Sequence, residues 1–381
     1  MRVAWSVLWL CSVMWLGGCA AQMAGHGQEM AGSGTVTQRV LAQGLYELVY
    51  SERQDAVFVV SAGDRHAPDA VSRVLRLDPV TLAVQSTITL PLRGFGLALD
   101  DASGRLYVGH SLDAAVSVVD IDQGGVRATI RLAEPVRTAD GMGRLPHHFR
   151  EMVVDTVTGR LFMPGLWFDD SALYVVDLGT QAVERVLPGL GFVATGIALD
   201  IDGRSVFVSN LQGQLFEFDA DTLALRQQRE LDVDQPLNLV FDHKARRLFM
   251  VDQGLAFIEE MRKTWVPAYM TKGAGNRVVA VDVQTGHFLL EMPARSGPVG
   301  MLLAAAQQRL YVALRESGSV AEYDIDTGRV LRVLTLGGQP NSLAFNPDGH
   351  VLYVTVKQDE AQEATAGSEG EIRDRVARIA F

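Results

Sequence analysis

The sequence predicts an all-β fold, a seven-bladed β-propeller whose ring is closed by an N-terminal strand, and three observations support this. A strand motif with one aromatic near its middle occurs seven times. Successive aromatics are 42 to 62 residues apart, which is the spacing of propeller blades. The last unit lacks a strand, and an unmatched strand stands near the beginning. The seven aromatics are Phe58, Tyr107, Phe162, Phe207, Phe249, Tyr311 and Tyr353.

The chain begins with a segment typical of a secretory signal, which we expect to be removed. Residues 1–18 contain one charge, Arg2, followed by a short apolar run and small residues, a layout too short for a membrane span. The motif "LGGC", residues 16–19, resembles a bacterial lipobox, which predicts lipidation of Cys19 and a membrane anchor there. Ala20, rather than Asp, favours the periplasmic side of the outer membrane.

The rest of the chain divides into a tether, residues 19–34, and a propeller domain, residues 35–381. The tether is rich in small residues, which predicts a flexible segment. Cys11 and Cys19 are the only cysteines, so the processed protein has no disulfide and must be stabilised by packing.

Each repeat predicts four antiparallel strands. An inner run such as "GLALD" leads through a short turn to the aromatic strand, then to a third strand that ends in Asp, and then to a fourth. An Asp in this position accepts backbone hydrogen bonds in a tight turn, so we interpret these residues as turn caps rather than metal ligands. They are Asp78, Asp120, Asp177, Asp219, Asp282 and Asp324.

The seventh repeat stops after its third strand, "DRVARIAF", at the end of the chain. The apolar-alternating run "TVTQRVLA", residues 35–42, has no blade of its own. We expect it to supply the missing fourth strand, because this closes the ring and removes an exposed sheet edge.

Long connections run only from second to third strands or between blades, so a propeller presents them on one face, where loops carry function. The two tryptophans outside the signal, Trp167 and Trp265, lie in these connections. They are either binding anchors or residues that fix their own loops. The segment "FIEEMRKTW" (257–265) has apolar residues at four-residue intervals and predicts a short amphipathic helix.

The net charge of −11 argues against a broad nucleic-acid surface, which needs clustered Lys and Arg. A local patch of arginines beside the two tryptophans is the alternative, because it would suit single-stranded DNA. Polar residues at the channel entrance and in the long loops are our candidates for ligand binding. They are Arg93, Arg144, His147, His148, Arg150, Trp167, Asn238, Trp265, Arg315, Asn341 and Lys357.

Catalytic and metal motifs are weak, and we predict no catalytic residue, metal or cofactor. His66, His110, His147 and His148 all fall on the long-loop side. His147 and His148 are adjacent, and adjacent residues of an extended segment point to opposite sides, which makes joint metal binding difficult. We therefore interpret the four as ordinary loop histidines. A hydrolase of the lactonase type, using groups such as His110, Asp169, Asp170 and Asn210, rests on fold analogy alone.

From about residue 35 to its end, the sequence resembles the YncE-like seven-bladed propellers of the bacterial periplasm. The motifs "RLDPVTLAV", "RLPHHFREMVVD", "PNSLAFNPDG" and "LYVTVKQ" carry this resemblance. It implies a secreted binding protein without established catalysis, for which single-stranded DNA has been proposed as a ligand. The lipobox and the insertion around Trp265 depart from the family pattern. We therefore expect a lipid-anchored binding or scaffold module whose partner is a periplasmic protein, a small ligand or single-stranded DNA.

Overall fold

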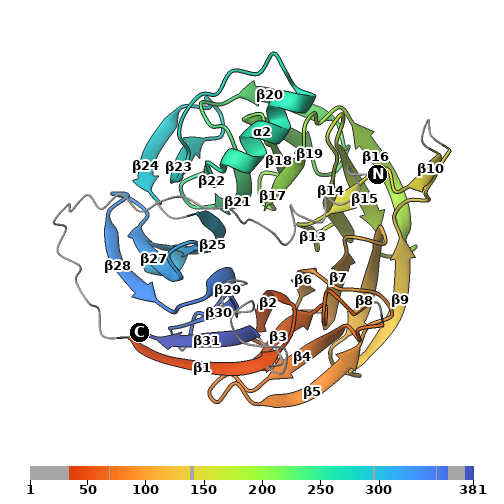
Figure 1. Ribbon diagram of the computed structural model, residues 1–381, viewed down its shortest axis with the longest axis vertical. Helices are drawn as coiled ribbons and strands as arrows, with labels where there is room; N and C mark the ends of the chain where they lie inside the picture. The colour runs from red at the N-terminus through yellow and green to blue at the C-terminus, as the bar shows by residue number, and fades with distance from the viewer. Residues whose placement is uncertain (1–33, 68, 138–140, 295–296, 349, 359–373) are drawn as a thin grey trace.

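A computed structural model describes residues 34–67, 69–137, 141–294, 297–348, 350–358 and 374–381. Within these residues, seven sheets are arranged in a ring around a central axis (Figure 1). The predicted seven-bladed propeller is therefore confirmed. The predicted signal, Cys19 and the tether up to residue 33 lie outside the described residues. No described helix is long and apolar enough to span a membrane.

The strands of the first three blades, from the axis outward, are as follows. Blade one contains β2 (Leu45–Ser51), β3 (Ala56–Ser61), β4 (Arg73–Leu77) and β5 (Val84–Thr89). Blade two contains β6 (Gly96–Asp100), β7 (Arg105–His110), β8 (Ala115–Asp120) and β9 (Gly125–Arg131). Blade three has a divided inner strand, β12 (His148–Phe149) and β13 (Val153–Asp155), beside β14 (Arg160–Leu166), β15 (Ala172–Asp177) and β16 (Ala182–Pro188).

The next three blades follow the same order. Blade four contains β17 (Ala194–Asp200), β18 (Ser205–Asn210), β19 (Gln214–Asp219) and β20 (Leu225–Glu230). Blade five contains β21 (Pro236–Asp242), β22 (Arg247–Asp252), β23 (Arg277–Asp282) and β24 (Phe288–Pro293). Blade six contains β25 (Pro298–Ala304), β26 (Arg309–Leu314), β27 (Ser319–Asp324) and β28 (Val330–Thr335), with a short 3-10 turn, η1 (Ala305–Gln307), between its first two strands.

Blade seven joins the two ends of the chain. Its strands are β29 (Gln339–Asn346), β30 (Val351–Lys357), β31 (Asp374–Ala380) and, outermost, β1 (Thr35–Ala42). β1 runs antiparallel to β31, with Thr35 opposite Ala380 and Val40 opposite Arg375. The predicted closing strand is confirmed, and the edge of β31 is covered.

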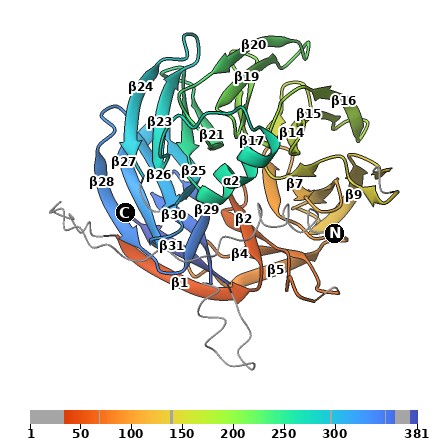
Figure 2. The ribbon, with the colours of Figure 1, turned by 45° about the horizontal axis from the view of Figure 1, so that its top comes forward.

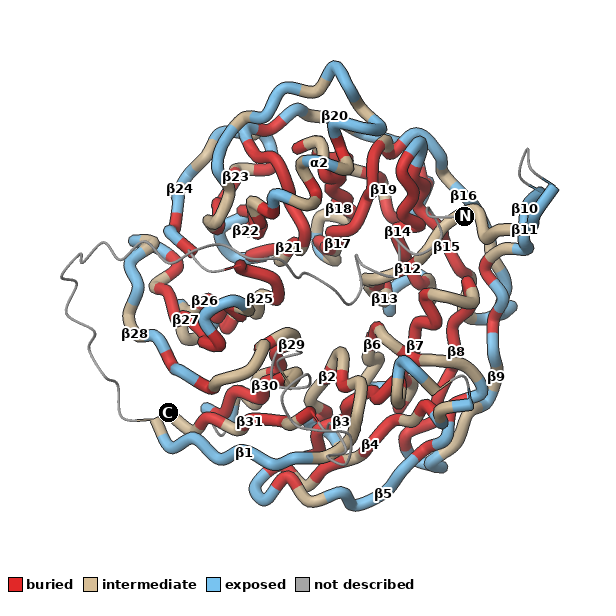
Figure 3. Tube along the Cα trace, viewed as in Figure 1, coloured by how far each residue is buried: buried red, intermediate tan, exposed pale blue. Residues whose placement is uncertain are grey.

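The core lies between neighbouring blades, because each sheet packs on both faces (Figure 3). The middle strands are almost wholly buried, whereas outer strands such as β5 and β9 are mostly exposed. The aromatic of the second strand contacts the next blade. Phe207 stacks on Phe241 at 5.5 Å between ring centroids, and Tyr353 stacks on Tyr50 at 5.9 Å across the junction that closes the ring.

The third-strand aspartates cap their turns, as predicted. Asp78 Oδ1 accepts hydrogen bonds from the backbone N–H groups of Val80 (3.0 Å) and Thr81 (2.7 Å), and these bonds lower the pKa of Asp78. The same backbone contacts recur at the other five positions, which are Asp120, Asp177, Asp219, Asp282 and Asp324. The turns opposite the long loops are therefore short and uniform, and we call that side the short-turn face.

The other side, the long-loop face, carries the connections 62–72, 132–147, 167–171 and 253–276. A small hairpin, β10 (Val136–Arg137) with β11 (Gly143–Arg144), belongs to the second of these. The last contains a helix, α2 (Ala256–Trp265), which confirms the helix predicted for 257–265. In the tilted view, α2 lies across the face near the inner strands of the ring (Figure 2).

The inner strands approach one another so closely that some positions admit only glycine. A Cβ on Gly300 would lie 2.1 Å from the backbone oxygen of Asn341 in the next blade. We expect Gly300→Ala to destabilise the fold by about 1–3 kcal/mol, because the backbones must separate. Denaturant unfolding would measure this.

The matched control is Gly125→Ala in β9, where an added Cβ meets nothing within 4 Å. This change should be neutral or stabilising, by up to about 1 kcal/mol. Equal effects of the two substitutions would contradict close packing of the inner strands.

Candidate ligand-binding site

Bulges in the inner strands direct polar side chains toward the axis. The pairing of β2, β21, β25 and β29 with its neighbour shifts register near the long-loop end of each strand. A bulge re-aims the side chains it contains. The bulged residues include Glu47, Asn238 and Asn341. In blade three, Arg150 and Glu151 occupy the gap between β12 and β13.

Contacts between blades that are not neighbours show that these side chains meet at the channel. Arg150 of blade three donates from Nη1 to Asn238 Oδ1 of blade five at 2.8 Å. Its Nη2 lies 3.5 Å from Glu151 Oε1. Because blade four separates blades three and five, the Arg150 side chain must extend across the axis. We call the residues gathered there the channel ring: Tyr46, Glu47, Arg150, Glu151, Asn238, Arg315, Asn341 and Lys357.

Arg315 follows β26 and forms the opposite part of the channel ring. Its Nη2 donates to Asn341 Oδ1, while its Nε is buried and has no hydrogen-bond partner among the described residues. Burial, together with the positive charge of Arg150, lowers the pKa of Arg315 to about 10. A guanidinium with an unused buried donor is an incomplete site that an added acceptor would satisfy.

Glu47 is the buried carboxyl group of the channel ring. Burial raises its pKa well above the usual value, the negative charge of Glu151 adds to this, and Arg150 acts in the opposite direction. Its Oε2 accepts a hydrogen bond from the Leu97 backbone N–H at 2.6 Å. Glu47 therefore binds its proton more tightly in the folded protein than in the unfolded chain.

Lys357, at the end of β30, completes the channel ring against an aromatic wall. Its Nζ lies 3.4 Å from the centroid of the Tyr46 ring, a cation–π contact. Tyr46 meets Phe95 edge to face at 4.8 Å. The channel ring thus holds three cations, Arg150, Arg315 and Lys357, and two carboxyl groups, one of which resists ionisation. Its charge is positive in a protein of net charge −11.

Trp167 belongs to a small core on the long-loop face, and Trp265 packs against the edge of that core. Trp167 is 8% exposed, with the Arg144 guanidinium carbon 4.1 Å from its ring centroid and the His148 ring stacked at 5.6 Å. Of the two roles predicted for Trp167, this geometry favours fixing its loop. Trp265 is 40% exposed and stacks on Phe168 at 5.2 Å, so one tryptophan does offer a surface to solvent.

A buried arginine fixes α2 over this core. Arg262 is 1% exposed and donates from Nη1 to the backbone oxygens of Leu211 (2.9 Å) and Asp234 (2.8 Å). Just before the helix, the Gln235 side-chain amide makes two hydrogen bonds with Leu255: its Nε2 donates to the backbone oxygen, and its Oε1 accepts from the backbone N–H. Gln235 immediately precedes the inner strand β21. The helix therefore starts at the rim of the channel.

The remaining predicted residues hold loops rather than join the channel ring. Arg93 donates to the backbone oxygen of Ala67, and Arg144 donates to those of Leu145 and Pro146. The four candidate arginines, Arg93, Arg144, Arg150 and Arg315, are thus divided, because only Arg150 and Arg315 share the channel.

His147 and His148 are likewise held in place by hydrogen bonds. His147 contacts the Tyr174 hydroxyl (2.9 Å) and the Asp170 backbone oxygen (3.2 Å), whereas His148 contacts the Ser111 backbone oxygen (3.2 Å). Burial lowers the pKa of both. The described residues contain no group of three or more His, Cys, Asp or Glu side chains that could hold a metal.

Two side chains considered for hydrolysis, His110 and Asn210, are buried and hydrogen-bonded within the fold. His110 contacts the Arg93 backbone oxygen at 3.0 Å and the Ser117 hydroxyl at 2.7 Å. Asn210 donates to the Leu190 backbone oxygen at 2.8 Å. Each stabilises its own blade.

Sequence reasoning missed Tyr46, Glu47 and Glu151. The available signal was a charged residue in the otherwise apolar inner run "LYELV". A buried carboxyl needs a partner, and a predicted inner strand with an acidic residue indicates one across the axis.

Fold and site together define a seven-bladed β-propeller with a polar, positively charged ring at its channel. Two relatives, each described only as uncharacterized protein YncE, come from Salmonella typhimurium (28% identical over 348 residues) and Escherichia coli K12 (29% over 348 residues), and each match covers 90% of both chains. The chain is thus similar to the YncE proteins along most of its length. No family model matches it. Hydrazine synthase from Kuenenia stuttgartiensis superposes with a TM-score of 0.64 at 16% identity, over 87% of this chain and 96% of that one, which shows a common fold.

We expect Glu47→Gln to stabilise the protein at pH 8 and to have no effect near pH 4. A raised carboxyl pKa means that stability is fully present below the unfolded value, about 4.3, and is lost as the pH rises through the folded value. The amide removes this loss and still accepts the bond from Leu97. Unfolding temperatures across this pH range would measure the difference.

The control is Glu134→Gln, at a side chain that is 77% exposed, which should change stability at neither pH. A lower unfolding temperature for Glu47→Gln at pH 8 would show instead that the ionised carboxylate stabilises the channel ring through Arg150.

Proposed function

We propose that the protein is a binding module that holds an anionic group of its ligand, a carboxylate or a phosphate, in the channel ring. The observation that carries this is the surplus of cations at the axis of an acidic protein, with the buried Arg315 Nε lacking an acceptor. Charge-assisted hydrogen bonds from guanidinium groups suit both anions.

The proposed site lies at the long-loop face, so a ligand larger than its anionic group extends toward the channel rim. α2 begins at this rim, and the Trp265–Phe168 stack lies at the other end of the helix. Because Arg262 anchors the helix, the rim is preformed and loses little conformational entropy on binding. These features support a binding role more directly than a catalytic one.

Calorimetric titration of the purified protein with inorganic phosphate, citrate and a short polyglutamate peptide tests the proposal. We expect Arg315→Met to weaken binding about tenfold or more, since a charged hydrogen bond is lost. The control is Arg329→Met in an exposed turn of the short-turn face, which removes the same charge and should leave affinity unchanged. Equal losses in both variants, or no binding of any probe, would refute an anion site in the channel ring.

Single-stranded DNA remains the alternative ligand, because its phosphates would use the same cations and its bases could stack on Trp265. An oligothymidylate included in the titration would distinguish it. Affinity that exceeds that of inorganic phosphate and falls steeply with salt would support a nucleic acid, whereas similar affinities would support a small anion.

We further propose that a lipid on Cys19 anchors the propeller on the periplasmic side of the outer membrane. The motif "LGGC" and the 16-residue stretch 19–34 before β1 support this. Labelling cells with an alkyne fatty acid should mark the wild-type protein and not Cys19→Ser. Cys11→Ser is the matched control, since that cysteine is predicted to leave with the signal. Unchanged labelling of Cys19→Ser would refute the anchor.

A further inference from the structure

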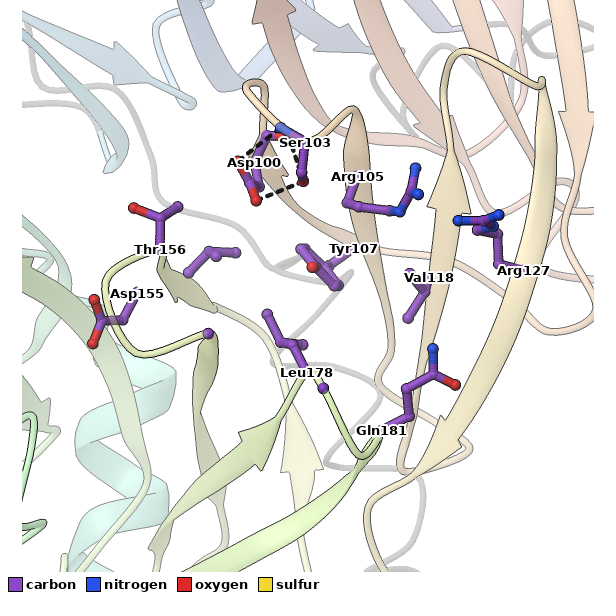
Figure 4. Close-up of a pocket in the computed structure, with 13 residues that line it drawn as sticks. Asp100, Ser103, Arg105, Tyr107, Val118, Arg127, Asp155, Thr156, Leu178 and Gln181 are labelled. Atoms are coloured by element: carbon purple, nitrogen blue, oxygen red, sulfur yellow. Dashed lines mark hydrogen bonds between the residues drawn. The ribbon is translucent and has the colours of Figure 1, made fainter.

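The junction between blades two and three contains a cavity on the short-turn face, away from the channel ring. Its volume is about 500 Å³, within the range of small-molecule sites. Its walls come from β7, β8 and β9 of blade two and from β13 and the turns of blade three (Figure 4). It is independent of the proposed anion site.

The cavity exists because one side chain is small. At three other junctions, the second-strand aromatic stacks on an aromatic of the next inner strand: Phe207 on Phe241, Tyr311 on Phe345 and Tyr353 on Tyr50. At this junction Tyr107 faces Val154, which occupies the position of Phe241 and Phe345. The space between blades six and seven, where Phe345 is present, measures only about 250 Å³.

Tyr107 supplies an unsatisfied polar group to this cavity. The residue is 4% exposed, and its hydroxyl has no hydrogen-bond partner among the described residues. Figure 4 shows its ring between the two blades, near the centre of the cavity. The hydroxyl oxygen is not fully buried, so it opens into the cavity, where it can exchange a hydrogen bond with a ligand.

The cavity offers donors and acceptors without a net charge. Arg105 and Arg127 both contact Asp120 Oδ2, at 3.0 and 3.5 Å. Arg127 makes this contact through Nε, and its two terminal nitrogens have no partner among the described residues. Asp100 lies on the opposite side and is bonded to Ser103. The carboxylate of Asp155 is directed to Arg204, at 2.5 Å, so its charge is neutralised.

The remaining walls are apolar patches and short polar side chains. Val118, Val154 and Leu178 provide the apolar surface, while Thr156 and Gln181 stand at the rim. A ligand that matches this surface is neutral, carries hydroxyl groups at its edge and has an apolar face. A sugar ring has these properties. We propose that the cavity between blades two and three binds a mono- or disaccharide.

Saturation-transfer NMR and calorimetry with trehalose, maltose and diacetylchitobiose test this proposal. At least one disaccharide should bind the wild-type protein. Val154→Phe should abolish binding, because it fills the cavity as Phe241 and Phe345 fill theirs. Arg185→Met, on the exposed outer strand β16, is the control and should bind as the wild type does.

Tyr107→Phe provides a second variant that does not depend on repacking. It should weaken sugar binding about tenfold, the equivalent of one hydrogen bond, with the unfolding temperature unchanged because the hydroxyl has no protein partner. Arg315→Met should leave sugar binding intact, which separates this proposal from the anion site. No binding of any of the three sugars, or equal binding by wild type, Val154→Phe and Tyr107→Phe, would overturn it.

Discussion

The pairing of β1 with β31 is the constraint on which the rest of the structure depends. These strands come from opposite ends of the domain, and their ladder runs from Thr35 opposite Ala380 to Ala42 opposite Asp374. A blade cannot bury both faces alone, so each junction is stable only when its neighbours are in place. The last junction, where Tyr50 stacks on Tyr353, forms only when the ends meet. Closure carries a loop-entropy cost, and it stabilises every blade at once.

Closure also creates the crowding that makes the channel ring possible. Seven inner strands converge on one axis, so their backbones approach until a position such as Gly300 has no room for a Cβ. Bulges relieve the crowding and turn Glu47, Asn238 and Asn341 inward. The polar groups then lie in a restricted space. Burial there raises the pKa of Glu47 and lowers the pKa of Arg315, so the neutral form of each group is favoured. The channel ring is positively charged because it holds three cations and two carboxyl groups, and burial raises the pKa of one of these, Glu47.

The two faces of the ring differ in what they can bind. The long-loop face combines the charged channel with a fixed helix. On the short-turn face, a cavity of about 500 Å³ lies between blades two and three, where Val154 stands in the place of an aromatic. The repeat explains the contrast. A position that is aromatic at three other junctions and small at this one leaves space without disturbing the blades, since the backbone ladders are unaffected.

The sequence by itself determined the propeller, its seven units, the closing strand 35–42, the capping aspartates and α2, because each follows from local periodicity or turn chemistry. It also identified Arg150, Asn238, Arg315, Asn341 and Lys357 as polar residues near the channel. Only the tertiary structure separated these from Arg93, Arg144 and the histidines and placed Trp167 in a core. It also added Tyr46, Glu47 and Glu151 to the channel ring. The reason is that the channel ring consists of contacts between blades far apart in the chain, such as Arg150 with Asn238, and no local pattern encodes which side chains meet across the axis.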